Sequence, residues 1–572
     1  MHQKNGLVFC FFELISLRME KIMLPVSKSL YIRKLICNFL KRRPLDKVDD
    51  GFPVDVRIVR DCLARIAEAE SGQNPADKPV CIDVRDCGAA YRFLMAVLAI
   101  TPGQWLLTGT ERLLHRPIEE LVEALRSIGA DVQYCSRRDG ACSVSFDNVV
   151  SSCKDGACPV PNDGDVYPFG DGARHISNDG DVYPFGDGAR HISSVGDVYP
   201  FGDGARHISS VGNVYPFGDG ARTVSTNAEY GCWQIHGKTL HASEMTIDCT
   251  RSGQFATALL LIADKIGLQE LHVQPEKPSS VAYIAMTKAV INGEADLTPQ
   301  RLGDWSAAVY WYANLLLSQQ QKNGKWELAA DADVMSAAGA KSFVCSELRN
   351  IEKNDDIPTS YKLMRMDLAS IQSDAVLARW FSEWGVESRQ EEDGVVISYN
   401  ERFIKQQEVV ELDMSQNVDL VPVLACMACL WPKKMIFNGV ANLRYKESDR
   451  LKVIQEQLSA FADIKLNTYN GIVDNQLVVN PRKDGACLVS DSGGALFHRD
   501  RACPVSTCSY GNNANCSGAD FVFDAHNDHR FVMGFSLFTL KGKVQIKGFD
   551  CVRKSYPDFH AEGIVGGTDV VG

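Results

Sequence analysis

Outside two repetitive stretches, the chain alternates short apolar segments with amphipathic ones, and this alternation constrains the fold more than any other feature. Apolar residues follow helical spacing in three segments, 30–40, 118–128 and 451–461. Short strand candidates follow turns at 233–235, 245–247, 395–398 and 544–546. The helix near 118 should open with Pro117 in its first turn and close at Gly129. Repeated strand–helix units of this kind predict an α/β or α+β fold.

The chain of 572 residues is long for one hydrophobic core, so we expect two or more domains. Its 45% hydrophobic and 23% charged residues are normal for a globular protein. The formal net charge of −12 argues against non-specific binding to nucleic acid or to an anionic membrane, so we expect neither as a partner. A basic site can still lie inside an acidic shell.

The 19 cysteines are scattered, and none pair at the spacing of a zinc finger. Cys426 and Cys429 lie in the apolar run 420–430, which favours buried core thiols over a metal or redox site. So many thiols suggest the reducing cytoplasm. The apolar segment Leu7–Leu17 is too short to span a bilayer and is not followed by a small-residue cleavage site. We interpret it as a first strand, or as translation from an upstream start.

Residues 164–225 contain four copies of one unit with a period of 16, beginning at Gly164, Gly180, Gly196 and Gly212. The units could stack as a small β-solenoid, or they could form a disordered loop rich in Gly and Asp. Their near-identity suggests recent duplication, which favours the disordered loop. The histidines at 175, 191 and 207 recur with the period, so they carry no independent signal for a metal site.

A second unusual stretch, 483–517, repeats the Asp-Gly-Ala-Cys phrase that also occurs at 139–142 and 155–158. We interpret this stretch, and the region of about 139–226 around the repeats, as surface insertions in loops. A fold tolerates such insertions at small entropic cost.

Cationic clusters lie where the expected helices begin, and others lie near the end of the chain. Lys28, Ser29 and Arg33 open the first helix, Arg116 precedes the second, and Lys446 to Arg450 lead into the third. Two further clusters are His526–Arg530 and Arg553–Asp558. Helix starts offer free backbone N–H groups and partial positive charge, which suit phosphate and carboxylate groups. Neither a Walker loop nor a Rossmann fingerprint is present, so the pattern indicates a small, highly phosphorylated substrate rather than ATP or NAD.

These clusters resemble, in order, the motifs of the 5-enolpyruvylshikimate-3-phosphate synthases. Gly88 to Arg92 (Gly-Ala-Ala-Tyr-Arg) is similar to Gly-Thr-Ala-Met-Arg, and Ser252 to Phe255 (Ser-Gly-Gln-Phe) to Ser-Ser-Gln-Phe. Asn442 to Arg450 (Asn-Leu-Arg-Tyr-Lys-Glu-Ser-Asp-Arg) resembles Asn-Trp-Arg-Val-Lys-Glu-Thr-Asp-Arg. Further matches are Lys28–Arg33, Thr108–Ile118, Asp419, Asn527–Arg530 and Lys554–Asp558. The resemblance covers nearly everything outside residues 1–22, the insertions and the last few residues.

The resemblance implies two domains, each built from three copies of a strand–helix unit, with ligands in the cleft between them. The first domain would comprise 1–24 and 301–572, and the second 25–300. The expected reaction transfers the enolpyruvyl group of phosphoenolpyruvate to the 5-hydroxyl of shikimate 3-phosphate and releases phosphate, on the shikimate pathway to chorismate and aromatic amino acids. The resemblance also implies a cytoplasmic monomer that needs neither cofactor nor metal, because Arg and Lys supply the charge stabilisation.

The resemblance further assigns roles to residues. Shikimate 3-phosphate would be held by Lys28, Ser29, Arg33, Ser252, Gly253, Gln254, Asp419, Asn442 and Lys446. Phosphoenolpyruvate would be held by Lys28, Gly88, Arg116, Gln254, Arg450, Arg530 and Lys554, with Lys446 touching both ligands. Asp419 would be the base on the 5-hydroxyl. Glu447, together with Lys28, would be the acid toward the methylene carbon, provided that desolvation or hydrogen bonding keeps Glu447 protonated.

The chain departs from the family pattern at several points. Gly253 replaces a serine, Ala89 replaces a threonine, and Lys277–Ser279 stands where the family has Arg-Pro-Tyr, so Tyr283 is a candidate substitute for that tyrosine. The run 563–567 (Gly-Ile-Val-Gly-Gly) replaces a final helix. These changes leave sensitivity to glyphosate open.

Two alternatives compete with an active synthase. One is a non-catalytic descendant whose repeats bind a partner, and the charged residues that are intact argue against it. The other is an enolpyruvyl transferase on a nucleotide sugar. The phosphate-directed set argues against that enzyme: Ser29, Arg33, Ser252 and Gln254.

Overall fold

The computed structural model describes residues 20–71, 79–135, 231–275, 281–322, 358–405, 407–482, 521–542 and 544–559. Within 136–230 it describes the backbone of four short strands. The expected strand at 7–17, most of the repeat region, the 483–517 insertion, Lys277–Ser279 and the last 13 residues lie outside the described part.

One strand–helix pattern occurs three times in the described residues. Its first copy runs β2 (Val80–Asp83), α4 (Gly88–Ile100), β3 (Gly103–Thr108), α6 (Glu119–Ser127), β4 (Asp131–Cys135) and β9 (Cys232–Gly237). The sheet order is β2-β3-β9-β4, with β2 and β3 parallel and the other two pairs antiparallel. Each parallel pair needs a crossover, and α4 supplies it here.

The second and third copies have the same order of pairing. One consists of β15 (Val409–Asp413), α11 (Val421–Leu430), β16 (Lys434–Asn438), α12 (Arg450–Leu458), β17 (Ala462–Tyr469) and β18 (Ile472–Pro481). The other consists of β1 (Glu20–Met23), α9 (Trp305–Lys322), β12 (Ser360–Met364), α10 (Leu377–Glu383), β13 (Val386–Glu391) and β14 (Gly394–Tyr399). The fold is therefore mixed α/β, as the alternation predicts.

Two smaller parallel pairs complete the sheets. The first is β10 (Glu244–Asp248) with β11 (Glu270–Gln274), joined by α7 (Gln254–Ile266) and followed by α8 (Val281–Asn292). The second is β19 (Phe521–Asp524) with β20 (Val544–Lys547), between which lie α13 (His529–Phe535) and a 3-10 turn, η9 (Ser536–Leu540). The remaining named helices are α2 (Lys28–Leu40), α3 (Val54–Glu70), α5 (Glu111–Leu114) and the 3-10 segments η3 (Pro299–Arg301), η5 (Ser373–Val376), η6 (Glu401–Phe403), η7 (Val418–Leu420), η8 (Ala441–Tyr445) and η10 (Phe549–Lys554).

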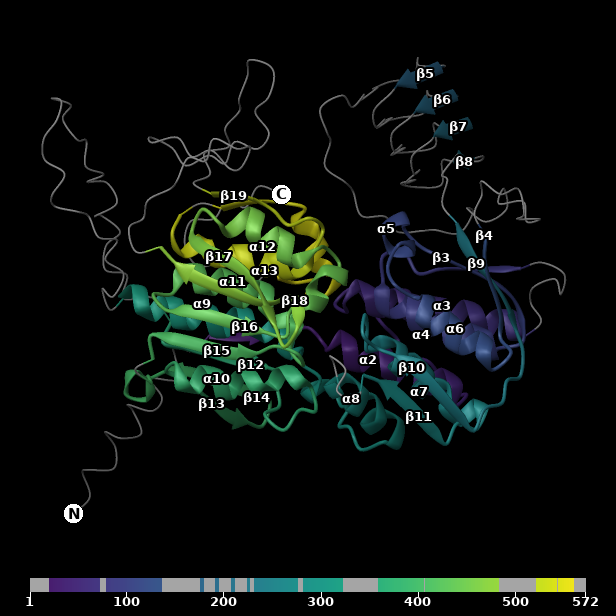
Figure 1. The fold of residues 1–572 in the computed structure, drawn as a ribbon, viewed down its shortest axis with the longest axis horizontal. Helices are drawn as coiled ribbons and strands as arrows, with labels where there is room; N and C mark the ends of the chain where they lie inside the picture. Colours follow the sequence, from purple (N-terminus) through teal and green to yellow (C-terminus); the bar gives the residue numbers. More distant parts are fainter. Residues whose placement is uncertain are drawn as a thin grey trace, which may run out of the picture.

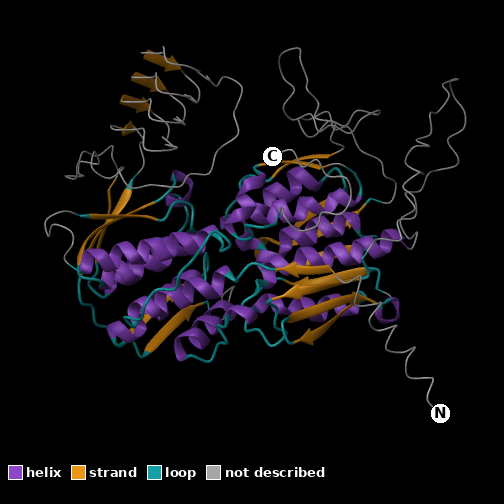
Figure 2. Cartoon of the chain, turned by 180° about the vertical axis from the view of Figure 1, so that it is seen from behind, coloured by secondary structure: helices purple, strands orange, loops and turns teal. Residues whose placement is uncertain are grey.

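The buried apolar residues form two large clusters. One runs from Ile22 and Leu24 to residues 305–559, and the other lies within 26–302. We call these parts the first body and the second body; they lie side by side in Figures 1 and 2. The chain passes between them twice, and the two passages are hydrogen-bonded to each other, with Ser27 donating to Leu302 and Asp304 to Pro25. The domain boundaries expected from the sequence, 24 and 301, remain a proposal.

The repeats contain a parallel ladder of four strands: β5 (His175–Asn178), β6 (His191–Ser194), β7 (His207–Ser210) and β8 (Val224–Thr226). Successive copies pair in register, so that residue 175 lies opposite 191, and 191 opposite 207 (Figure 1). For these segments the stacked arrangement is correct and the favoured disordered loop is wrong. Equal spacing places equivalent residues of successive copies opposite one another, so the copies can pair in register.

Element boundaries differ from the expectations by one to three residues. The helix near 118 begins at Glu119 with Ile118 as its cap, so Pro117 precedes the helix instead of lying in its first turn. The four strand candidates are all strands, each longer by one to three residues. Cys426 lies fully buried in α11, in the first body's core. In the part of the chain that the structure describes, no helix has the length and apolar character to cross a bilayer.

Candidate functional site

A cleft between the two bodies gathers almost all the residues that the resemblance assigns to ligands. Its lining includes Lys28, Ser29, Arg33, Gly88, Arg116, Ser252, Gly253, Gln254, Asp419, Asn442, Lys446, Glu447, Arg450 and Arg530. The exception is Lys554, which is held by Asp86, two residues before Gly88. Residues as far apart in the sequence as Lys28 and Arg530 thus converge on one space.

The start of α2 supplies the first cations on the second body's side. Lys28 is the first residue of the helix, after the cap Ser27, and its Nζ lies 3.0 Å from a carboxylate oxygen of the buried Asp55. The buried Arg33 donates to Thr287 Oγ1 at 2.8 Å and to the Ser29 carbonyl at 2.7 Å. Burial lowers the pKa of Arg33 to about 10, so this guanidinium remains charged near neutral pH.

The start of α4 brings two arginines together. Gly88 is the first helical residue, and a side-chain Cβ there would lie 2.5 Å from Arg116 Nη1. Arg92, one turn later, donates to the Pro117 carbonyl and, at 2.9 Å, to Gln254 Oε1. Burial, together with the neighbouring Arg116, lowers the pKa of Arg92 to about 9. Two adjacent guanidinium groups repel each other, and a bound anion would offset this repulsion.

The start of α7 carries Ser252, Gly253 and Gln254. The Gln254 backbone N–H donates to Ser252 Oγ at 3.3 Å, and Gly253 caps the helix without a side-chain hydrogen bond. The change from serine to glycine at 253 therefore removes a hydroxyl from a helix start that faces the cleft.

On the first body's side, Arg450 organises three carboxylates. Its Nη1 donates to Asp419 at 2.7 Å, its Nη2 to Glu447 at 2.9 Å and its Nε to Asp528 at 2.7 Å. Lys446 Nζ lies 3.2 Å from Asp419. Burial and these anions act in opposite directions on Arg450, and the anions prevail, raising the pKa of the guanidinium above its ordinary value.

The two candidate catalytic carboxylates are both ionised in this arrangement. Burial alone would raise the pKa of Asp419, but Lys446, Arg450 and Arg530 outweigh it and lower that pKa below its ordinary value. For Glu447, Arg450, Arg116 and Lys554 likewise overcome burial and hold the pKa well below 4.5. An ionised Asp419 suits a base, whereas Glu447 meets the condition for an acid only if some of this positive charge is neutralised.

The turn before α13 presents His529 and Arg530. His526 and Asn527 adopt left-handed backbone angles (φ of 49° and 55°), and Asp528 caps the helix. Both ring nitrogens of His529, and Nε and Nη1 of Arg530, are buried without a hydrogen-bond partner in the described residues. Burial, with Lys28 and Arg530 nearby, holds the pKa of His529 well below 6.5, so this imidazole is neutral.

Two residues of the cleft received no role from sequence reasoning: Asp55, which pairs with Lys28, and Arg92, which anchors Gln254. Tyr283, the candidate substitute for the family's tyrosine, does line the cleft, and its hydroxyl donates to Asp419 Oδ2 at 3.3 Å. Arg92 stands within a motif that was recognised, and its fixed place there was the available signal. Asp55 lies in a different helix from its partner, and nothing in the sequence pattern links the two.

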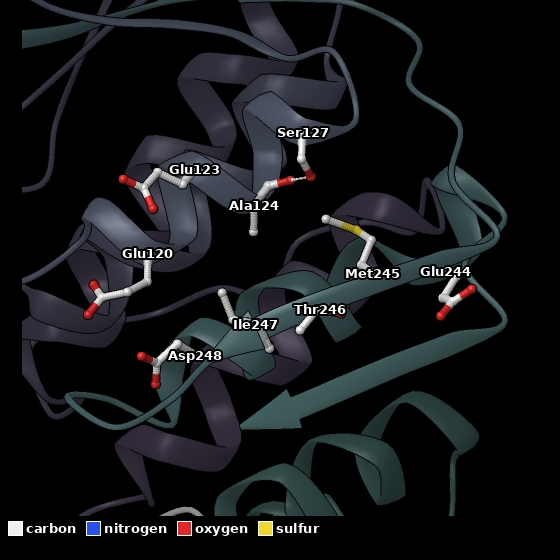
Figure 3. A pocket seen from close by; sticks show the side chains of 9 residues that line it. All are labelled: Glu120, Glu123, Ala124, Ser127, Glu244, Met245, Thr246, Ile247 and Asp248. Atoms are coloured by element: carbon white, nitrogen blue, oxygen red, sulfur yellow. Dashed lines mark hydrogen bonds between the residues drawn. The ribbon is translucent and has the colours of Figure 1, made fainter. Parts of the chain in front are cut away.

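A second depression lies between α6 and β10 (Figure 3). Its lining carries four carboxylates and no cation: Glu120, Glu123, Glu244 and Asp248. Such a surface repels phosphate, so the interbody cleft is the better candidate for an anionic ligand. Among the residues that the structure describes, no group of three or more His, Cys, Asp or Glu side chains is placed to hold a metal ion.

The cleft can therefore hold small anions against a ring of Lys and Arg while keeping carboxylates within reach of them. Comparisons with known proteins show which family this chain resembles. The family model described as "EPSP synthase (3-phosphoshikimate 1-carboxyvinyltransferase)" matches residues 56–146, 359–477 and 507–562.

Curated relatives carry the name 3-phosphoshikimate 1-carboxyvinyltransferase. One from Dehalococcoides mccartyi is 23% identical over 57% of this chain, and the chain covers 62% of that relative. Another, from Bacteroides fragilis, is 22% identical over 94% of this chain and 93% of its own length. Among solved structures, an EPSP synthase from Acinetobacter baumannii matches with a TM-score of 0.45 and 13% identity, covering 95% of this chain and 94% of its own.

The family model matches segments of both bodies, and these segments contain Gly88, Arg116, Asp419, the Asn442–Arg450 motif, Arg530 and Lys554. The chain belongs to the EPSP synthase family.

Proposed function

We propose that this protein transfers the enolpyruvyl group of phosphoenolpyruvate to the 5-hydroxyl of shikimate 3-phosphate and releases inorganic phosphate, in the cytoplasmic shikimate pathway. The observation that carries the proposal is the convergence of Lys28, Arg116, Lys446 and Arg530 around Asp419 in one cleft. Both substrates are phosphorylated carboxylates. Holding two such anions side by side requires several cations to offset their mutual repulsion.

The proposed reaction proceeds by addition and elimination. Asp419 takes the proton of the 5-hydroxyl as that oxygen forms a bond to C2 of phosphoenolpyruvate, and the methylene carbon receives a proton from Glu447 or Lys28. The group that gave this proton then takes a proton back from the new methyl group, the C2–O bond to phosphate breaks with its electron pair leaving on the phosphate, and the double bond returns. The arginines stabilise the phosphate as its charge develops.

The charge of the bound substrates would favour the protonated form of Glu447. Arg450, Arg116 and Lys554 hold the pKa of Glu447 low against the effect of burial. Two bound phosphates and two bound carboxylates would offset this positive charge, so that burial raises the pKa and favours the protonated acid. The same anions would make Asp419 a stronger base.

The test is phosphate release by the purified protein with both substrates, beside an Asp419→Asn variant that keeps the shape of the side chain. We expect turnover in the natural protein and a loss of about 10²–10⁴-fold in the variant, the range for a general base. Asp393→Asn is the control, because Asp393 is an exposed carboxylate that pairs with Lys362. Equal rates for natural protein and Asp419→Asn would contradict the proposed role of Asp419. No turnover in folded natural protein would refute the function.

A further inference from the structure

Lys554 makes a charged contact between the two bodies at the edge of the cleft. Its Nζ donates to Asp86 Oδ2 at 2.9 Å and to the carbonyl oxygen of the same residue at 2.6 Å. Lys554 ends η10 in the first body, and Asp86 lies in the turn between β2 and α4 in the second. The lysine side chain is 10% exposed and the aspartate 37%, so water reaches the pair mainly from the side of Asp86.

The turn that carries Asp86 also builds the substrate cleft. Cys87 caps α4, accepting from the Ala90 N–H, and Gly88 is the first helical residue. A second contact between the bodies lies nearby, where Arg112 of α5 donates to the His526 carbonyl at 3.3 Å. Asp86 thus joins the start of α4 to the first body through a charged pair.

The cations assigned to phosphoenolpyruvate differ in their present partners. Arg116 Nε, and Nε and Nη1 of Arg530, have no hydrogen-bond partner in the described residues, so these groups give up no partner when they donate to a ligand. Lys554 instead donates two hydrogen bonds to Asp86, which uses two of its three N–H groups. An incoming anion has to compete with the Asp86 carboxylate for this ammonium group.

We propose that Asp86 is a positioning residue that holds Lys554 at the edge of the cleft. When phosphoenolpyruvate binds, it replaces Asp86 as the partner of the Lys554 ammonium group. The inference rests on the proposed function, because it takes Lys554 as a ligand of phosphoenolpyruvate. Exchange of one anionic partner for another keeps Lys554 paired throughout, and burial of an unpaired ammonium is avoided. Asp86 thereby weakens phosphoenolpyruvate binding and leaves shikimate 3-phosphate binding unchanged.

The charge state of Lys554 supports an exchange between ion pairs. Burial lowers the pKa of this lysine, but Asp55, Asp86 and Glu447 together raise it above its ordinary value. The ammonium therefore stays charged at neutral pH, and its affinity for a carboxylate or phosphate does not depend on gaining a proton.

The first test is the variant Asp86→Asn, which keeps the size and the acceptor oxygen but removes the charge. We expect the KM for phosphoenolpyruvate to fall three- to tenfold and the KM for shikimate 3-phosphate to stay within twofold. Asp393→Asn is the matched control, since Asp393 is 47% exposed and pairs with Lys362, which is 11% exposed. An unchanged or higher KM for phosphoenolpyruvate in Asp86→Asn would overturn the proposal.

The second test does not use turnover. Lysines are acetylated with trace acetic anhydride in the ligand-free protein, and the rate at each lysine is read by mass spectrometry. In Asp86→Asn we expect Lys554 to react at least threefold faster, while Lys362 reacts as before. Equal Lys554 rates in the two proteins would overturn the holding role of Asp86. A faster Lys554 in a protein that never turns over would refute the proposed function and still support the contact.

Discussion

At the scale of single residues, Gly88 shows how little room the cleft leaves. A Cβ at this position would lie 2.5 Å from Arg116 Nη1 and 3.3 Å from Arg92 Nη1. The first distance is too short for any stable contact, so Arg116 would have to move. Arg116 Nη1 is the far end of a flexible side chain, so a shift of that side chain can relieve the contact.

We therefore predict that Gly88→Ala raises the KM for phosphoenolpyruvate about tenfold, the loss of roughly one charge-assisted hydrogen bond. The KM for shikimate 3-phosphate should stay within twofold, because the displaced group belongs to the other ligand. Steady-state kinetics with each substrate varied in turn would measure both values. Gly293→Ala is the control for loss of stability alone, because Gly293 has positive φ and nothing within 4 Å of an added Cβ. Equal changes in both KM values for Gly88→Ala would contradict the displacement of Arg116.

At the scale of elements, Arg450 joins three of them. It is the first residue of α12, and its partners are Asp419 in η7, Glu447 just before α12 and Asp528 at the cap of α13. A buried guanidinium is costly unless its hydrogen bonds are satisfied, and removing it leaves buried carboxylates without a cation. Arg450 is thus a structural link between these elements as well as a candidate ligand for phosphoenolpyruvate.

We predict that Arg450→Met lowers the free energy of unfolding by about 3–5 kcal/mol at neutral pH, the usual effect of breaking a buried pair. Arg389→Met should cost about 1 kcal/mol or less, because Arg389 is an exposed partner of Glu391. Asp419 and Glu447 have folded-state pKa values below their ordinary 3.8 and 4.5, so their stabilising effect is complete above those values and is lost as the pH falls below them.

The difference between the natural protein and Arg450→Met should therefore shrink on acidification. Urea unfolding at neutral pH and again at about pH 4 would measure this difference in the free energy of unfolding at each pH. A difference that stays constant with pH would mean that packing of the side chain, and not its charge, accounts for the loss.

The helices and strands were more predictable from the sequence than the side-chain contacts between them. Helical spacing and helix-start residues placed α2, α6 and α12 to within a few residues, because these signals are local. The pairs Arg450–Asp528 and Lys554–Asp86 span 78 and 468 positions, and only the packing of the bodies brings them together. The near-identity of the repeats indicates recent duplication, but it also places the same residues opposite one another in successive copies, and this second effect gives the ladder its register.

At the scale of the whole molecule, the ladder β5-β6-β7-β8 is inserted in the connection between the two strands of a β-hairpin. Strands β4 and β9 pair antiparallel, and Cys135 at the end of β4 lies opposite Cys232 at the start of β9. The ends that the whole 136–231 stretch connects are therefore adjacent, at a distance that a short turn spans. The sheet β2-β3-β9-β4 needs nothing from the repeats to complete its hydrogen bonding.

From this arrangement we predict that replacing residues 139–226 by a short Asn-Gly-containing turn leaves phosphate release with both substrates within about twofold of the natural protein, because a long loop adds little entropy to such a closure. The residues lining the cleft come from Lys28 to Arg116 and from Arg251 onward, on either side of the excised stretch. Circular dichroism would show that the shortened protein is folded, and kinetics would compare both KM values. A folded variant that has lost turnover, with Asp419 and the cations in place, would mean that the ladder contributes to the cleft or to its closure. The repeats would then contribute to catalysis and not only occupy the connection between β4 and β9.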